Sequence, residues 1–100
     1  MDFETLRTED MRLVILRLLC MDPGRDLNEH LLRAAMATYG HEPSRDRLRS
    51  EVAWLEEQGL VTTRRVESLL IVKLTVRGED VAHGRSTVPG VKRPCLEDMA

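Results

Sequence analysis

Residues 44–61 read SRDRLRSEVAWLEEQGLV, and this stretch decides which fold the chain is expected to adopt. Ser44 is a favoured N-cap and Gly59 a favoured C-terminal stop, so the stretch predicts a helix over 45–58. Aliphatic residues recur inside it at spacings of four and three, which indicates one buried face. These residues are Leu48, Val52 and Leu55. The opposite face then carries arginines near the N-terminal end of the helix.

Two further helices are predicted before this stretch. The first covers 8–21, with Thr8 as its N-cap, and it is apolar on more than one side. Such a helix needs cover on more than one side, and a second copy of the same helix can supply it in a small domain. The second helix covers 27–39 and ends at Gly40.

Beyond Gly59 the helical spacing gives way to residues typical of strands. Residues 60–65 and 69–74 predict two strands joined by a short turn, which together form a β-hairpin. Thr75 then caps a short helix over 76–83.

Three helices, a β-hairpin and a short closing helix, in this order, predict an α+β fold of the winged helix-turn-helix type. A chain of 100 residues is long enough for one domain, which we expect over residues 1–84. Residues 85–100 show no periodicity and are expected to form an extended C-terminal tail.

Two motifs support this fold by resemblance. Five spaced residues resemble the recognition helix and wing entry of winged-helix regulators: Val52, Leu55, Gly59, Leu60 and Val61. Residues 74–85, LTVRGEDVAHGR, resemble the Leu-Thr-x-x-Gly ending of the same families. With VPGVKRP at 88–94, the chain is also similar to small winged-helix proteins of Mu-like prophages that are labelled as ArsR-type regulators. The resemblance implies a DNA-binding transcriptional regulator of phage or prophage origin.

Metal binding and catalysis are not expected. ArsR-type regulators often hold metal through paired cysteines and histidines, but here Cys20, Cys95 and the three histidines are scattered along the chain. A metal site needs several ligands that converge with fixed geometry, so we expect no metal and no cofactor. The sequence has no glycine-rich phosphate loop, no Gly-x-Ser-x-Gly and no His-Glu-x-x-His, so we expect no enzyme.

The sequence also favours a cytoplasmic protein. Its longest apolar runs, 13–16 and 18–21, are far shorter than the roughly 20 residues that cross a bilayer. The N-terminal residues are acidic, whereas a secretory signal begins with basic ones. We therefore expect no membrane contact and reduced cysteines.

Charge is distributed unevenly along the chain. The formal net charge is −2, but residues 1–44 hold five basic and eight acidic side chains, whereas residues 45–93 hold ten basic and seven acidic ones. A surface for double-stranded DNA is therefore expected in the second half.

The arginines of the 45–58 helix are the first candidates for DNA contact. Arg45 and Arg49 lie one turn apart on its exposed face, and arginine is well suited to bidentate contact with guanine. In the hairpin, three basic side chains are candidates for phosphate or minor-groove contact. The full predicted set is Ser44, Arg45, Arg47, Arg49, Ser50, Arg64, Arg65 and Lys73.

A second interpretation of these charges remains open. The helix arginines can instead pair internally, Arg47 with Glu51 and Arg49 with Asp46, and leave a solvated face. The hairpin cations can instead prevent edge-to-edge pairing of the sheet. Glu67, in the hairpin turn, opposes phosphate binding.

Two kinds of partner follow from these patterns. A regulator is expected to be a homodimer that places two 45–58 helices in adjacent major grooves, about 34 Å apart. The predicted dimer interface lies on the first helix and consists of Leu13, Leu16, Arg17 and Cys20. The alternative is a protein–protein interaction module in phage assembly or packaging without DNA binding. The net charge and the acidic pair Glu56 and Glu57 favour that alternative.

Overall fold

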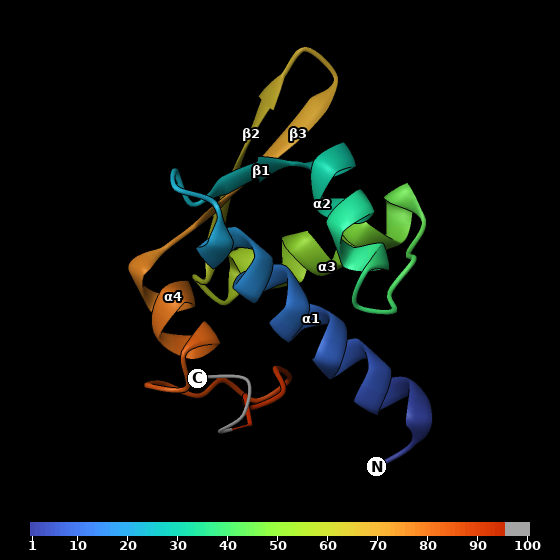
Figure 1. Cartoon of the computed structure of the whole chain (residues 1–100), viewed down its shortest axis with the longest axis vertical. Coiled ribbons are helices and arrows are strands. Elements are labelled where there is room, and N and C mark those ends of the chain that lie inside the picture. The colour runs from blue at the N-terminus through green and yellow to red at the C-terminus, as the bar shows by residue number, and fades with distance from the viewer. Residues whose placement is uncertain (96–100) are drawn as a thin grey trace.

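The computed structural model describes residues 1–95, which form four helices and one three-stranded antiparallel sheet (Figure 1). The elements, in chain order, are α1 (Phe3–Met21), β1 (Asp26–Asn28), α2 (Glu29–Ala37), α3 (Arg45–Glu57), β2 (Val61–Val66), β3 (Leu69–Leu74) and α4 (Val76–Ala82). The predicted α+β class is therefore confirmed, and the order of elements is compatible with a winged helix-turn-helix domain.

Helix α1 starts earlier than predicted. Its N-cap is Asp2 rather than Thr8, because the Asp2 carboxylate accepts a hydrogen bond from the Thr5 backbone N–H at 2.8 Å. Both residue types are good N-caps, so local sequence alone did not separate the two starts. The extra turns project beyond the body of the molecule and leave Phe3 and Leu6 exposed (Figure 1).

Strand β1 was not predicted. Residues 26–28 pair antiparallel with β3, so the sheet has the order β1-β3-β2. The predicted helix over 27–39 begins two residues later, after Asn28, whose side chain caps α2 through the Leu31 N–H at 2.8 Å. A strand of three residues forms only because it pairs with β3, which lies far along the chain, and local sequence patterns do not reveal such a partner.

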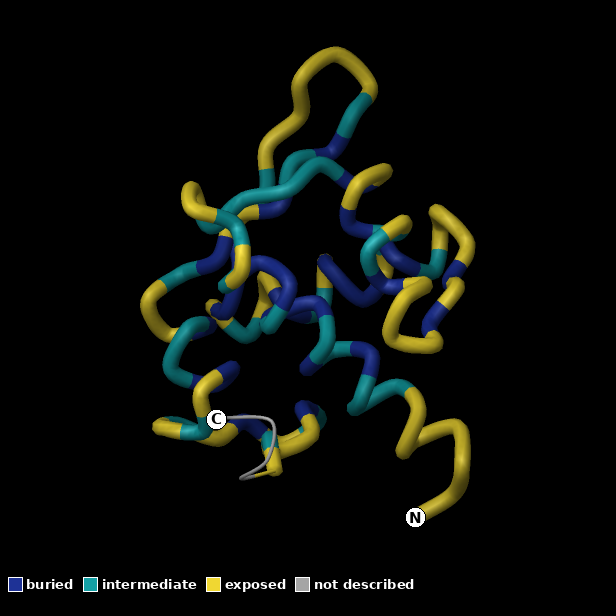
Figure 2. The backbone as a smooth tube through the Cα atoms, in the orientation of Figure 1, coloured by how far each residue is buried: buried dark blue, intermediate teal, exposed yellow. Residues whose placement is uncertain are grey.

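Helix α1 supplies much of the core. Leu13 and Leu16 were predicted to bind a second copy, but they are 3% and 0% exposed within the single chain. The structure corrects that expectation, because these two residues offer no surface to a partner. Figure 2 shows the same distribution along the backbone, with buried positions at the centre and exposed ones at the hairpin turn and the N-terminal end of α1.

The segment predicted as an extended tail packs against the domain as far as Lys92. Val88 and Val91 belong to the core, and the Lys92 N–H donates to the Glu9 carbonyl at 3.2 Å. Arg12 donates to the Gly90 carbonyl at 3.0 Å and stacks on the Trp54 ring, 3.8 Å from its centroid. The domain boundary was predicted at residue 84, but residues before and after it contribute to the same hydrophobic core. Residues 96–100 lie outside the described part of the chain.

Replacing Gly90 with alanine is expected to loosen this segment. Gly90 has φ +100°, and an added Cβ would lie 2.7 Å from the Trp54 ring. We expect faster tryptic cleavage near residue 92 and a change in the fluorescence of the single tryptophan. Gly40→Ala is the matched control, because its φ is +85° and nothing lies within 4 Å of its added Cβ. Equal cleavage rates in the two variants would contradict the prediction.

Candidate nucleic-acid interface

Helix α3 forms largely as predicted. The Ser44 hydroxyl accepts from the Arg47 N–H at 3.0 Å, and the predicted aliphatic face is buried. One acidic residue, Glu51, shares that buried face with Leu48, Val52 and Leu55. The charged residues of α3 therefore divide between the inside and the outside of the molecule.

Arg49 is held by a buried carboxylate on α2. Its Nε and one Nη donate to the two oxygens of Glu29, each at 2.8 Å, and Glu29 is 0% exposed. The same carboxylate accepts from the Leu70 N–H of β3 at 2.8 Å and lies 3.5 Å from Arg45. The hydrogen bonds from Arg49 are the main reason that the pKa of Glu29 falls from 4.5 to about 2, although burial acts in the opposite direction.

The same two arginines fix the hairpin turn. Arg45 and Arg49 both donate to the Ser68 carbonyl, at 3.3 and 3.2 Å. Glu29 therefore joins α2, the N-terminal half of α3 and the hairpin through one set of contacts. Internal pairing of Arg49 occurs as the second interpretation supposed, but its partner is Glu29 and not Asp46.

Arg47 is also used inside the molecule. It forms the i,i+4 ion pair with Glu51 at 2.9 Å and donates to the Thr8 hydroxyl at 2.9 Å. Glu51 in turn binds Arg12 of α1 at 2.7 Å. Arg47 therefore ties α3 to α1, which is the internal pairing that the sequence left open.

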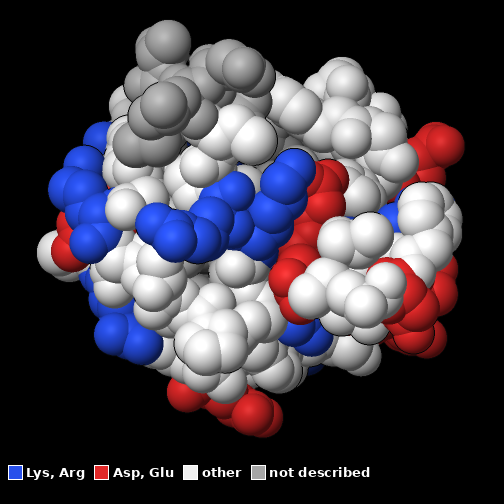
Figure 3. All heavy atoms as spheres, turned by 90° about the horizontal axis from the view of Figure 1, so that it is seen from below, with Lys and Arg blue, Asp and Glu red and all other residues white. Residues whose placement is uncertain are grey.

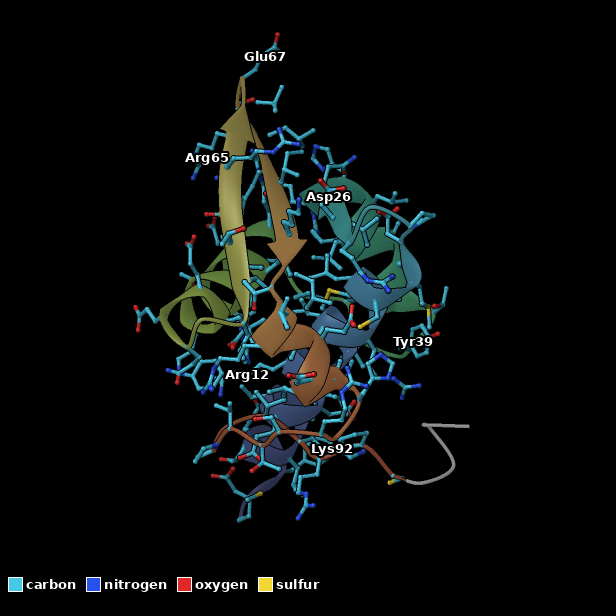
Figure 4. The ribbon with its side chains drawn as sticks, turned by 90° about the vertical axis from the view of Figure 1, so that its left-hand side faces the viewer. Arg12, Asp26, Tyr39, Arg65, Glu67 and Lys92 are labelled. Atoms are coloured by element: carbon cyan, nitrogen blue, oxygen red, sulfur yellow. The ribbon has the colours of Figure 1, made fainter. Side chains whose placement is uncertain are left out.

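The strand register places the three hairpin cations on two faces. The Thr63 N–H and hydroxyl both contact Glu56 of α3, so Thr63 and Arg65 face α3. Arg64 and Lys73 occupy the other face, where Arg64 lies 3.8 Å from Asp26. Figure 4 shows Arg65 and Asp26 on opposite sides of the hairpin. The predicted set does not form one continuous strip.

One group of predicted residues does remain together on the solvent side of α3. Ser44, Arg45 and Ser50 are exposed, and Arg65 is exposed on the hairpin face that looks towards α3. At the opposite end of the molecule, a run of basic side chains crosses the surface and meets acidic side chains at one end (Figure 3), and Lys92 forms an ion pair with Asp10 at 3.2 Å. The exposed residues of the predicted set therefore lie on the N-terminal half of α3 and on the hairpin face towards it.

Sequence reasoning missed Glu29, which organises this surface. Glutamate on a short amphipathic helix normally faces water, and its partners Arg49 and Leu70 lie far away in the sequence. The available signal was indirect. It consisted of Arg45, which has no acidic residue three or four positions away on α3 to pair with.

Within residues 1–95, no group of three or more His, Cys, Asp or Glu side chains is placed to hold a metal ion. In the same part of the chain, no helix is both long enough and apolar enough to cross a membrane. Burial raises the pKa of the Cys20 thiol, so this cysteine is less reactive than an exposed one.

Comparison with known proteins shows that the sequence is similar to that of a bacteriophage protein. The chain is 52% identical over 87 residues to the uncharacterized protein gp26 of Escherichia phage Mu, a match that covers 87% of this chain and 90% of gp26. The chain belongs to the phage Mu gp26 family. An uncharacterized protein of Haemophilus influenzae is 42% identical over 78 residues, covering 77% of this chain and 76% of that protein. No family model and no solved structure matches.

Proposed function

We propose that this member of the gp26 family is a DNA-binding transcriptional regulator with a winged helix-turn-helix fold. The observation that supports this most is that Ser44, Arg45 and Ser50 are exposed along the N-terminal half of α3, while Arg65 is exposed on the hairpin face that turns towards α3. In the proposed complex, α3 enters the major groove and the β2–β3 hairpin acts as the wing.

The chemistry of this group suits a DNA backbone. The N-terminus of a helix attracts phosphate because its first N–H groups are not used within the helix, and Ser44 marks that position in α3. The side chain of Arg45 is 44% exposed, so its guanidinium can reach a phosphate or a guanine edge. Arg47 and Arg49 were predicted to contact DNA, but they bind Glu51 and Glu29 and so hold α3 in place. The similarity to a phage protein fits a regulator of phage genes.

Arg45→Ala and Arg65→Ala are each expected to weaken duplex binding about tenfold and to reduce its salt dependence. The measurement is fluorescence anisotropy of labelled duplex DNA at two salt concentrations. Arg77→Ala is the matched control, because Arg77 is an exposed arginine on α4 that contacts the Gln58 carbonyl at the other end of α3. Binding that is absent at low salt, or equal in all three variants, would exclude the proposed surface.

A protein–protein interaction module in phage assembly or packaging is the second candidate. The observation in its favour is the outermost stripe of α3, which carries acidic residues towards both ends and no arginine. This stripe consists of Asp46, Ser50, Ala53 and Glu57. An acidic stripe repels phosphate, so failure of the DNA titration would make this candidate the leading one.

A further inference from the structure

Helices α1 and α2 leave an apolar face open to solvent on the side of the molecule away from α3. We define the α1–α2 face as Val14, Arg17, Met21, Leu31 and Tyr39, which lie over the buried Leu18. Met21 is 59% exposed, Leu31 53% and Tyr39 48%. Figure 4 shows Tyr39 pointing outward on one side of the body, with α3 on the other side. Exposed large apolar side chains that cluster in this way mark an interaction surface more often than isolated ones do.

Two shallow hollows meet on this face and carry opposite charges. The first is lined by Arg17 and Tyr39, and the second by Asp22 and Leu31. Both hollows share Leu18 and Met21. The face therefore has an apolar centre with a cation on one side and an anion on the other.

We propose that a second copy of this chain docks on the α1–α2 face, with a two-fold axis that passes over Met21. A rotation of 180° about this axis brings the first hollow of one copy opposite the second hollow of the other copy. Arg17 then lies opposite the partner's Asp22, and the same pair forms a second time on the other side of the axis. A two-fold interface must be complementary to itself, and this arrangement of charges meets that condition. The unbranched Met21 side chain adapts to an uneven surface and can fill the centre.

This interface changes the dimer expected from the sequence. The helix is α1 as expected, and Arg17 keeps its place, but the apolar contacts come from Val14 and Met21 rather than from Leu13 and Leu16. Figure 4 shows α3 on the other side of the body from Tyr39, so the two α3 helices lie on opposite outer sides of the proposed dimer. The proposal therefore does not rest on DNA binding or on half-sites in adjacent grooves.

The test is sedimentation velocity of the whole protein over a concentration series. We expect a wild-type dimer, and we expect Met21→Glu and Leu31→Glu to raise its dissociation constant at least about a hundredfold, because each buries an unpaired carboxylate at the interface. Val76→Glu is the matched control, since Val76 is 82% exposed on α4, outside this face. Arg17→Glu is expected to weaken the dimer as well, and to remove most of its salt dependence.

Circular dichroism establishes that each variant is folded, which is expected because Met21 and Leu31 are more than half exposed. Two outcomes would overturn the proposal. A wild-type protein that stays monomeric at every concentration would leave the α1–α2 face to a different protein. A dimer that survives Met21→Glu and Leu31→Glu unchanged would place the second copy elsewhere on the molecule.

Discussion

Glu29→Gln is expected to lower the free energy of unfolding at pH 7 by about 2 kcal/mol. The shift of the Glu29 pKa from 4.5 to about 2 corresponds to about 3 kcal/mol of stability. The part-exposed guanidinium groups of Arg45 and Arg49 are screened by solvent, which reduces that figure. Glutamine keeps one oxygen for the Leu70 N–H but removes the charge that both arginines bind. Urea denaturation of the two proteins at pH 7 measures the difference.

The same variant is expected to change how stability depends on pH. The folded-state pKa of Glu29 is depressed, so its contribution is complete above about pH 4.5 and is lost as the pH falls towards 2. The gap in stability between wild type and Glu29→Gln should therefore narrow over that range. Glu57→Gln is the matched control, because it removes an exposed carboxylate from α3 and should leave both the stability and its pH dependence unchanged. A constant gap from pH 5 to pH 3 would show that charge at Glu29 is not what holds the hairpin.

The local features of the fold were the predictable ones. Helix α3 follows from Ser44, Gly59 and the apolar spacing between them, because capping and periodicity act within a few residues. Strand β1 and the packing of Val88 depend on contacts with segments far along the chain. No local pattern records such contacts, so the sequence could place neither of them.

In the candidate site, too, the features set by local sequence could be predicted and those set by distant contacts could not. Exposure of Arg45 and Ser50 follows from their positions on a single helix, and it was predicted correctly. The roles of Arg47 and Arg49 depend on carboxylates and hydroxyls brought to them by other elements, Glu29 above all. The sequence pattern of an arginine on a helix face is the same whether its side chain is available to bind a phosphate or already binds a buried carboxylate. Only the arrangement of α1, α2 and the hairpin around α3 separates the two cases.

Gly78→Ala is expected to destabilise the protein by at least about 3 kcal/mol. Gly78 lies in the first turn of α4, where its N–H donates to the Thr75 hydroxyl at 3.0 Å. An added Cβ would overlap the backbone carbonyl of Leu60 and would lie 2.7 Å from a methyl carbon of Leu74. The carbonyl cannot move aside freely, because it accepts from the Thr75 N–H at 3.1 Å. Urea denaturation followed by circular dichroism measures the loss.

This close approach gives a physical reason for the glycine in the Leu-Thr-x-x-Gly motif. The motif joins the end of β3 to α4, and α4 comes so near to Leu60 that no side chain fits between them. Gly24→Ala is the control, because its added Cβ would meet only the ends of two aspartate side chains, at 3.2 and 3.3 Å, and these can shift. If Gly78→Ala were as stable as Gly24→Ala, α4 would have to be able to move away from Leu60 without loss. In that case the motif glycine would serve the local turn and not the packing of α4 on the sheet.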